Sequence, residues 1–80
     1  MLQPQRLRNK FEKKYFVILP TQRETEILKC MADGLTSIQT GHRLGISTKT
    51  VETHRKNLQR KFNAVNACQL VYLATKAGHI

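Results

Sequence analysis

The sequence predicts an all-α domain of four helices across residues 20–80, because four helix start signals alternate there with four helix stop signals. Apolar residues between these signals recur at helical spacing, and each helix therefore has one face suited to a shared core. A chain of 80 residues suffices for one small domain with a compact core. Residues 1–19 would precede this domain as a basic segment, compatible with a helix or with an irregular arm.

The first two helices carry the same start signal. Thr21 with Glu24, and Thr36 with Gln39, have the spacing of a capping box, in which each side chain bonds the backbone of the other residue. A glycine follows each segment and would end the helix in the left-handed conformation. The expected apolar anchors are Ile27, Leu28 and Met31 in the first helix, and Ile38 and Leu44 in the second.

Residues 47–62 form one long predicted helix with two opposite faces. Val51, Leu58 and Phe62 recur at helical spacing and would form a buried stripe. The opposite face is expected to carry Lys49, Glu52, Thr53, Lys56 and Arg60. The cationic residues of this segment are Lys49, Arg55, Lys56, Arg60 and Lys61. One acidic residue accompanies them, so the helix suits a polyanionic partner, although an ordinary solvated helix face is the alternative.

The second and third helices are joined in the manner of a helix-turn-helix. Gly45 ends the short helix, Ile46 enters the core, and Ser47 caps the long helix. The turn between them is about three residues long, as this motif requires.

The last helix would start at Asn66 with Gln69, after Asn63 has ended the third helix, and would end at Gly78. Its expected apolar side consists of Ala67, Leu70, Val71, Ala74 and Ala77. A second, weaker stripe consists of Cys68, Val71, Tyr72 and Thr75. This weaker stripe could meet another subunit.

The N-terminal segment is basic and amphipathic. Its cationic residues are Arg6, Arg8, Lys10, Lys13 and Lys14, against the single acid Glu12. Its apolar residues are Leu7, Phe11, Tyr15 and Ile18, which would share one stripe of a helix. A disordered arm or the remnant of a linker is the alternative, and it would still attract phosphates.

The overall charge of the chain indicates which class of partner it binds. A net charge of +9 and a pI of about 10.2 favour a polyanion, with nucleic acid first and an anionic membrane second. There is no apolar run long enough for a bilayer and no secretory signal, so we expect a cytoplasmic protein without a membrane partner.

Catalysis and metal binding are not expected. Cys30 and Cys68 are far apart in the sequence, and neither has another Cys or a His at the spacing of a metal site. We therefore expect two buried thiols and no metal or cofactor. His42, His54 and His79 form no constellation with either cysteine, so no pair of nucleophile and base arises.

Residues 20 to about 77 resemble the LuxR-type, or GerE-type, helix-turn-helix, and within it the output domains of NarL/FixJ-class response regulators. The resemblance is carried by Thr21-Gln22-Arg23-Glu24, Glu26-Ile27-Leu28, Gly34, Leu44-Gly45-Ile46-Ser47, Lys49-Thr50-Val51-Glu52-Thr53-His54-Arg55, Asn57-Leu58, Arg60-Lys61 and Asn66. It implies a four-helix DNA-binding domain that dimerises through its last helix and places its third helix in the major groove.

The sequence also departs from the family pattern. Pro20 replaces the usual Leu, and Ala67 replaces a common Arg. Ile38-Gln39-Thr40-Gly41 replaces the usual Lys-Glu-Ile-Ala run, which predicts a looser second helix with fewer phosphate contacts.

The resemblance and the two faces of the third helix predict DNA contacts for individual residues. We expect Glu52, Thr53 and Lys56 to read base edges. The expected phosphate contacts are Thr36, Ser47, Thr48, Lys49, Thr50, His54, Arg55 and Arg60. His54 could instead be a half-buried packing group, and Glu52 could instead orient Lys49 or Lys56.

The leading prediction is therefore a sequence-specific transcription regulator that binds double-stranded DNA as a homodimer, with RNA polymerase or a related regulator as further partners. One alternative is a truncated interaction module that pairs with a full-length regulator. Another is a module like region four of sigma factors, which docks on polymerase. The chain lacks the receiver of NarL/FixJ proteins, so it is either a fragment or a single-domain member.

Overall fold

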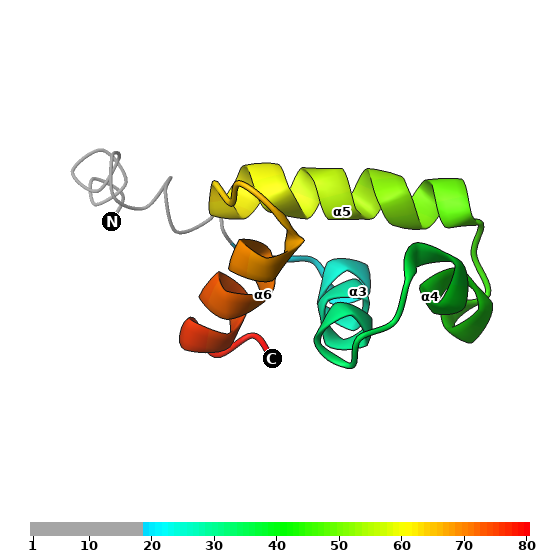
Figure 1. The fold of residues 1–80 in the computed structure, drawn as a ribbon, viewed down its shortest axis with the longest axis horizontal. Helices are drawn as coiled ribbons and strands as arrows, with labels where there is room; N and C mark the ends of the chain where they lie inside the picture. The colour runs from blue at the N-terminus through cyan, green and yellow to red at the C-terminus, as the bar shows by residue number, and fades with distance from the viewer. Residues whose placement is uncertain (1–18) are drawn as a thin grey trace, which may run out of the picture.

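The computed structural model describes residues 19–80, and in this part the chain folds into four helices without a β-strand. The helices are α3 (Gln22–Ala32), α4 (Ser37–Leu44), α5 (Thr48–Phe62) and α6 (Ala67–Lys76) (Figure 1). The prediction of an all-α domain with four helices is confirmed. The basic segment with an amphipathic stripe is expected for residues 1–19, and all of it except Leu19 lies outside the described residues.

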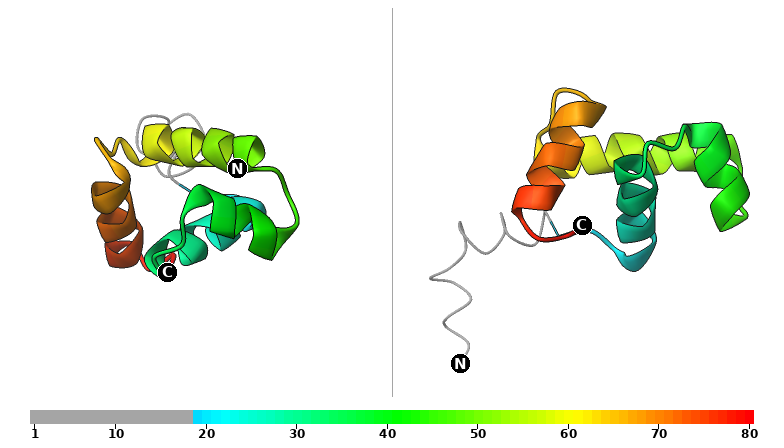
Figure 2. Two further views of the ribbon diagram at one scale, coloured as in Figure 1. Left: turned by 45° about the vertical axis from the view of Figure 1, so that its right-hand side comes forward. Right: turned by 60° about the horizontal axis from the view of Figure 1, so that its bottom comes forward.

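Helix α5 organises the domain. It is the longest of the four and contacts each of α3, α4 and α6. The three shorter helices lie on one side of it, with α4 near its N-terminal end and α6 near its C-terminal end, as Figures 1 and 2 show. The other side of α5 is left open to solvent. None of the four helices is long and apolar enough to cross a membrane.

The predicted helix ends are present. Thr21 and Glu24 exchange both hydrogen bonds of a capping box, at 3.1 and 3.0 Å, and Thr36 and Gln39 do the same at 3.1 and 2.9 Å. Gly45 and Asn63 end their helices with the positive φ angles that a left-handed terminator requires.

The start of α6 differs in one detail from a capping box. Asn66 accepts a hydrogen bond from the Gln69 amide at 2.8 Å, as predicted. The Gln69 side chain, however, accepts from the amide of Val65 at 2.7 Å, one residue before the expected partner.

The core confirms the apolar stripe of α5. Val51 and Leu58 are fully buried, and Phe62 is 9% exposed. These side chains pack with Ile27, Leu28, Met31, Leu70 and Ala74. The prediction of a core position is wrong for two residues. Ile38 is 60% exposed, and Ala77 is exposed beyond the last turn of α6.

Ile38 is exposed because α4 turns a different face inward. Ser37, Thr40 and Gly41 are its buried residues, and Leu44 packs against the core from the same side. At Gly41 a Cβ atom would lie 2.7 Å from the carbonyl oxygen of Ile46, so any larger residue would push the turn away from α4. A small, polar inner face lets α4 lie close to the turn and to α5.

Candidate nucleic-acid interface

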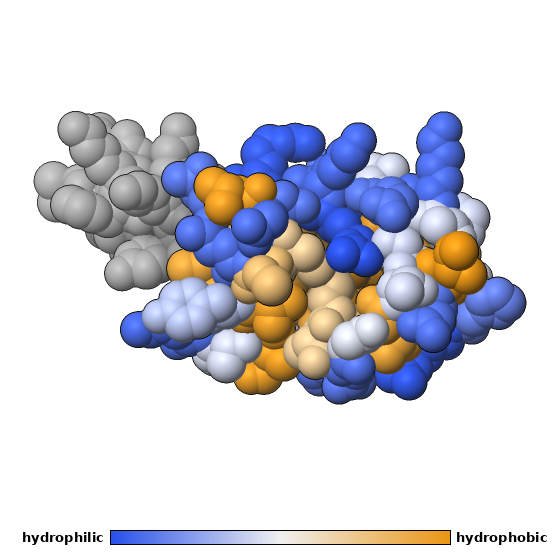
Figure 3. Space-filling view, viewed as in Figure 1, coloured by the Kyte–Doolittle hydropathy of each residue, from blue (hydrophilic) through white to orange (hydrophobic). Residues whose placement is uncertain are grey.

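A row of polar side chains runs along the open side of α5. Lys49, Thr53, Lys56 and Arg60 are all exposed, at spacings of four, three and four, directly opposite the buried stripe. We call these four residues the outer row. Figure 3 shows hydrophilic side chains projecting from the side of the molecule where α5 lies. Glu52 is also exposed and flanks this row.

The N-terminus of α5 is open as well. The Ser47 hydroxyl accepts a hydrogen bond from the Thr50 amide at 3.0 Å and donates to the Thr50 hydroxyl at 2.9 Å. Thr48 beside them is exposed, and so is Thr36 at the start of α4. A helix N-terminus carries partial positive charge and suits an anion such as a phosphate.

The outer row has few internal contacts. The Thr53 hydroxyl donates to the carbonyl oxygen of Lys49 at 3.1 Å, which leaves its lone pairs free to accept. Among residues 19–80, no ion pair joins Glu52 to Lys49 or Lys56. The alternative role for Glu52, in which it orients a lysine, stays a prediction.

Two cations of α5 point away from the open side. The Arg55 guanidinium donates from Nη1 to the Ser37 hydroxyl at 2.8 Å, and the Lys61 ammonium lies 2.7 Å from Glu24 Oε1. Arg55 lies four residues after Val51, so it borders the buried stripe. Only the other three cations of the segment belong to the outer row. Counting charges along the sequence therefore overstated the positive charge of this face.

Glu24 is a buried acid that sequence reasoning treated only as a helix cap. It is 5% exposed, and its Oε1 accepts from the amide of Thr21 as well as from Lys61. Burial raises its pKa, but the hydrogen bonds from Lys61 and Thr21, with the charges of Lys61 and His54, bring the pKa below its ordinary value. No local pattern marks a pair separated by 37 positions.

His54 lies between the two faces of α5. It is half-buried, and its Nδ1 atom is buried without a hydrogen-bond partner among the described residues. This placement agrees with the alternative of a half-buried packing group. The expected phosphate contact of His54 stays a prediction.

The weaker stripe of α6 is mostly on the surface. Cys68 and Thr75 are exposed and Tyr72 is 58% exposed, with the Lys76 ammonium 5.8 Å from the centre of its ring. Val71 is half-buried and packs against the core. The stripe thus offers a small exposed surface whose one aliphatic member also supports the fold. Cys30 is buried as expected, whereas the prediction of a buried thiol at Cys68 is wrong.

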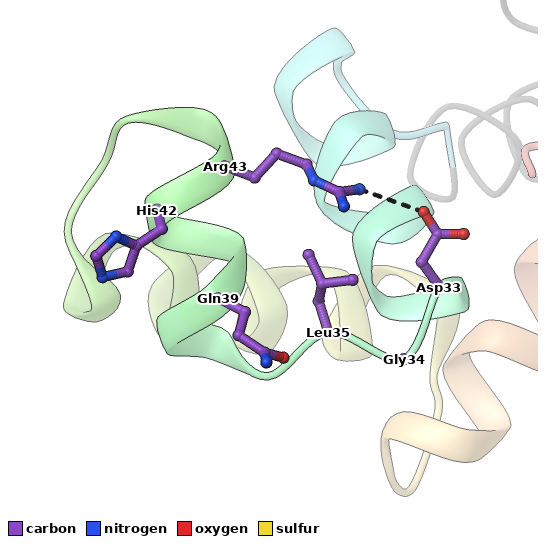
Figure 4. Close-up of a pocket in the computed structure, with 6 residues that line it drawn as sticks. All are labelled: Asp33, Gly34, Leu35, Gln39, His42 and Arg43. Carbon is purple, nitrogen blue, oxygen red and sulfur yellow. Dashed lines mark hydrogen bonds and ion pairs between the residues drawn. The ribbon is translucent and has the colours of Figure 1, made fainter.

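An open hollow lies between the end of α3 and α4. It has a volume of about 660 Å³ and is lined by Asp33, Gly34, Leu35, Gln39, His42 and Arg43 (Figure 4). Arg43 Nη1 lies 3.4 Å from Asp33 Oδ2, an exposed pair of the kind that contributes little stability.

A short helix, a glycine turn and a long helix with an open cationic side define the helix-turn-helix class of proteins. Residues 20–74 match the family model described as bacterial regulatory proteins, luxR family. The chain belongs to this family, which confirms the resemblance found in the sequence.

Similar proteins include a transcriptional activator and two regulatory proteins. The chain is 42% identical over 60 residues to the transcriptional activator protein PhzR of Pseudomonas fluorescens, covering 75% of this chain and 25% of PhzR. It is 41% identical over 58 residues to the uncharacterized response regulatory protein YgeK of Escherichia coli, covering 72% of this chain and 40% of YgeK. It is 40% identical over 58 residues to the transcriptional regulatory protein FixJ of Azorhizobium caulinodans, covering 72% of this chain and 28% of FixJ. The chain thus spans from a quarter to two fifths of the length of these relatives.

Proposed function

We propose that the protein is a sequence-specific transcription regulator that binds double-stranded DNA with α5 in the major groove. The outer row of α5 supports this proposal most directly, because its side chains are exposed and have few internal partners. Lys56 can donate to guanine O6 or N7, Glu52 can accept from cytosine N4, and the Thr53 hydroxyl can accept from a base amino group. These three residues are the proposed base-reading set.

The proposed phosphate contacts surround this set. Lys49 and Arg60 provide exposed positive charge at the two ends of the outer row. The helix N-termini supply hydroxyl and amide groups through Thr36, Ser47, Thr48 and Thr50. His54 and Arg55 complete the predicted set, but both are half-buried and would contribute less than the exposed groups.

Pairing of two domains on DNA would use the surface of α6. Four side chains, Cys68, Val71, Tyr72 and Thr75, cover much less than the roughly 800 Å² per partner of a stable interface. The free domain would therefore be mostly monomeric and would pair on adjacent half-sites, where the effective concentration of the second copy is high. RNA polymerase or a related regulator are proposed further partners, and the cytoplasm is the proposed location.

Selection of bound duplexes from a random DNA pool tests sequence specificity and pairing together. A recurring motif, repeated or two-fold symmetric, is the expected result. The affinity for a selected duplex should also fall steeply with salt, because each phosphate contact adds roughly 0.9 to the slope of log affinity against log salt. A slope near zero would contradict nucleic-acid binding, and a pool without enrichment would contradict sequence specificity.

A further inference from the structure

Arg55 bridges the two helices of the helix-turn-helix. Its Nη1 atom donates to the hydroxyl of Ser37 at 2.8 Å, across 18 positions of the chain. Ser37 is the first residue of α4 and is only 7% exposed, so its hydroxyl is closed to an outside ligand. A hydrogen bond with a charged donor is roughly twice as strong as a neutral one. The contact therefore joins α5 firmly to the first turn of α4.

Helix α4 packs closely against α5, and among the described residues the bond from Arg55 to Ser37 is the one side-chain hydrogen bond between these two helices. The inner face of α4 carries the unpaired hydroxyl of Thr40 and the bare backbone of Gly41, and Leu44 is the one aliphatic side chain that it packs against the core. Its ion pair to α3, from Arg43 to Asp33, is exposed and 3.4 Å long. Packing of small side chains is not directional, so the bond between Arg55 and Ser37 is the contact best suited to fix the angle of α4 against α5.

We infer that Arg55 is a positioning residue that fixes α4 against α5 and so sets the angle at which α5 enters the groove. The inference rests on the proposed DNA-binding function. It assigns to Arg55 a role other than phosphate contact, because the side chain borders the buried stripe instead of the outer row. Arg55 also lines a hollow of about 310 Å³ with Met31, Leu35 and Val71, beside α3 and α6.

Ser37→Ala is the most discriminating variant, because it removes the acceptor without changing any charge. Arg55→Met removes the donor, and the exposed Lys29→Met is a control for loss of one positive charge elsewhere. Affinities are measured at several salt concentrations for a selected duplex and for a random duplex. The specificity ratio is the affinity for the selected duplex divided by the affinity for the random duplex. It should fall about tenfold in Ser37→Ala and in Arg55→Met, and no further in the double variant.

The salt slope separates positioning from phosphate contact. If Arg55 acts by positioning α4, Arg55→Met changes the slope of log affinity against log salt no more than Lys29→Met does. If Arg55 instead binds a phosphate, Arg55→Met reduces this slope by about a further 0.9, and Ser37→Ala leaves the specificity ratio unchanged. That combination would overturn the inference. Circular dichroism checks that each variant is folded.

Amide hydrogen exchange in the free protein gives a readout that does not need DNA. Exchange within α4 should accelerate in Ser37→Ala and in Arg55→Met, and exchange within α3 should not. Unchanged exchange in α4 would overturn the inference, even if the wild-type protein bound no DNA and the proposed function failed. If exchange within α4 accelerates in the variants but their specificity ratio stays that of the wild type, the bond has only a structural role, and this result would also overturn the inference.

Discussion

The buried hydroxyl of Thr40 predicts that Thr40→Val stabilises the domain. Thr40 is fully buried in α4, and its Oγ1 atom has no hydrogen-bond partner among the described residues. An unpaired buried hydroxyl costs about 1–3 kcal/mol, because it loses its hydrogen bonds to water. Valine places a methyl group where the hydroxyl was, keeps the β-branched shape, and leaves no polar atom to satisfy.

We expect the free energy of unfolding to rise by about 1–2 kcal/mol in Thr40→Val. For a domain of this size, each kcal/mol raises the Tm by roughly 4–8 °C. Thermal and urea unfolding, followed by circular dichroism, measure both quantities. Thr25→Val is the matched control, since the Thr25 hydroxyl donates to the carbonyl oxygen of Thr21 at 3.0 Å and its loss should give no gain.

An unchanged or lower Tm in Thr40→Val would refute this reasoning. It would show that the hydroxyl is hydrogen-bonded in solution, or that the close approach of α4 to α5 does not accept the methyl group. Equal stabilisation in Thr25→Val would refute it too, because the gain would then come from general apolar substitution and not from the unpaired hydroxyl.

Three further predictions concern the interface, the pairing surface and the buried acid. Lys56→Ala should reduce sequence preference more than Lys49→Ala, which should weaken binding to all duplexes evenly; identical profiles in a binding titration would contradict these assignments. Tyr72→Asp should abolish cooperative occupation of two half-sites and leave single-site affinity intact; persistent cooperativity in gel-shift titrations would place the pairing surface elsewhere. The lowered pKa of Glu24 contributes stability that is present above its ordinary pKa of 4.5 and is lost as the pH falls through the lowered value. Lys61→Met should lower stability by about 1–3 kcal/mol at neutral pH and flatten this acid dependence, and an unchanged pH profile of urea unfolding would argue against the pairing.

The helices and their ends could be predicted because their causes are local. The capping pairs Thr21 with Glu24 and Thr36 with Gln39 lie within one turn, and the left-handed residues Gly45 and Asn63 are set by their own backbone preferences. The stripe of α5 was predictable for the same reason, since helical spacing alone places its members on one side.

Features that depend on packing between helices could not be predicted. Ile38 is apolar but faces solvent, because α4 turns Ser37, Thr40 and Gly41 inward and approaches the turn at Ile46 too closely for a larger residue at Gly41. Lys61 is a cation in a basic helix, yet it is paired with an acid from another helix. Arg55 carried a partial signal, since it lies four residues after Val51 and three before Leu58, which places it beside the buried stripe.

The separation of the two faces of α5 has a consequence for how such a domain can change during evolution. Lys49, Lys56 and Arg60 do not belong to the core cluster. The hydrogen bond of Thr53 goes to the backbone of its own helix, and Arg60 donates to the Asn57 side chain at 3.1 Å in an exposed contact within α5. Exposed helix positions without special contacts usually tolerate substitution within about 0.5 kcal/mol of stability. A lineage could therefore exchange these four side chains without first acquiring compensating stabilising mutations, and under the proposed function the exchange of Thr53 and Lys56 would alter the preferred operator.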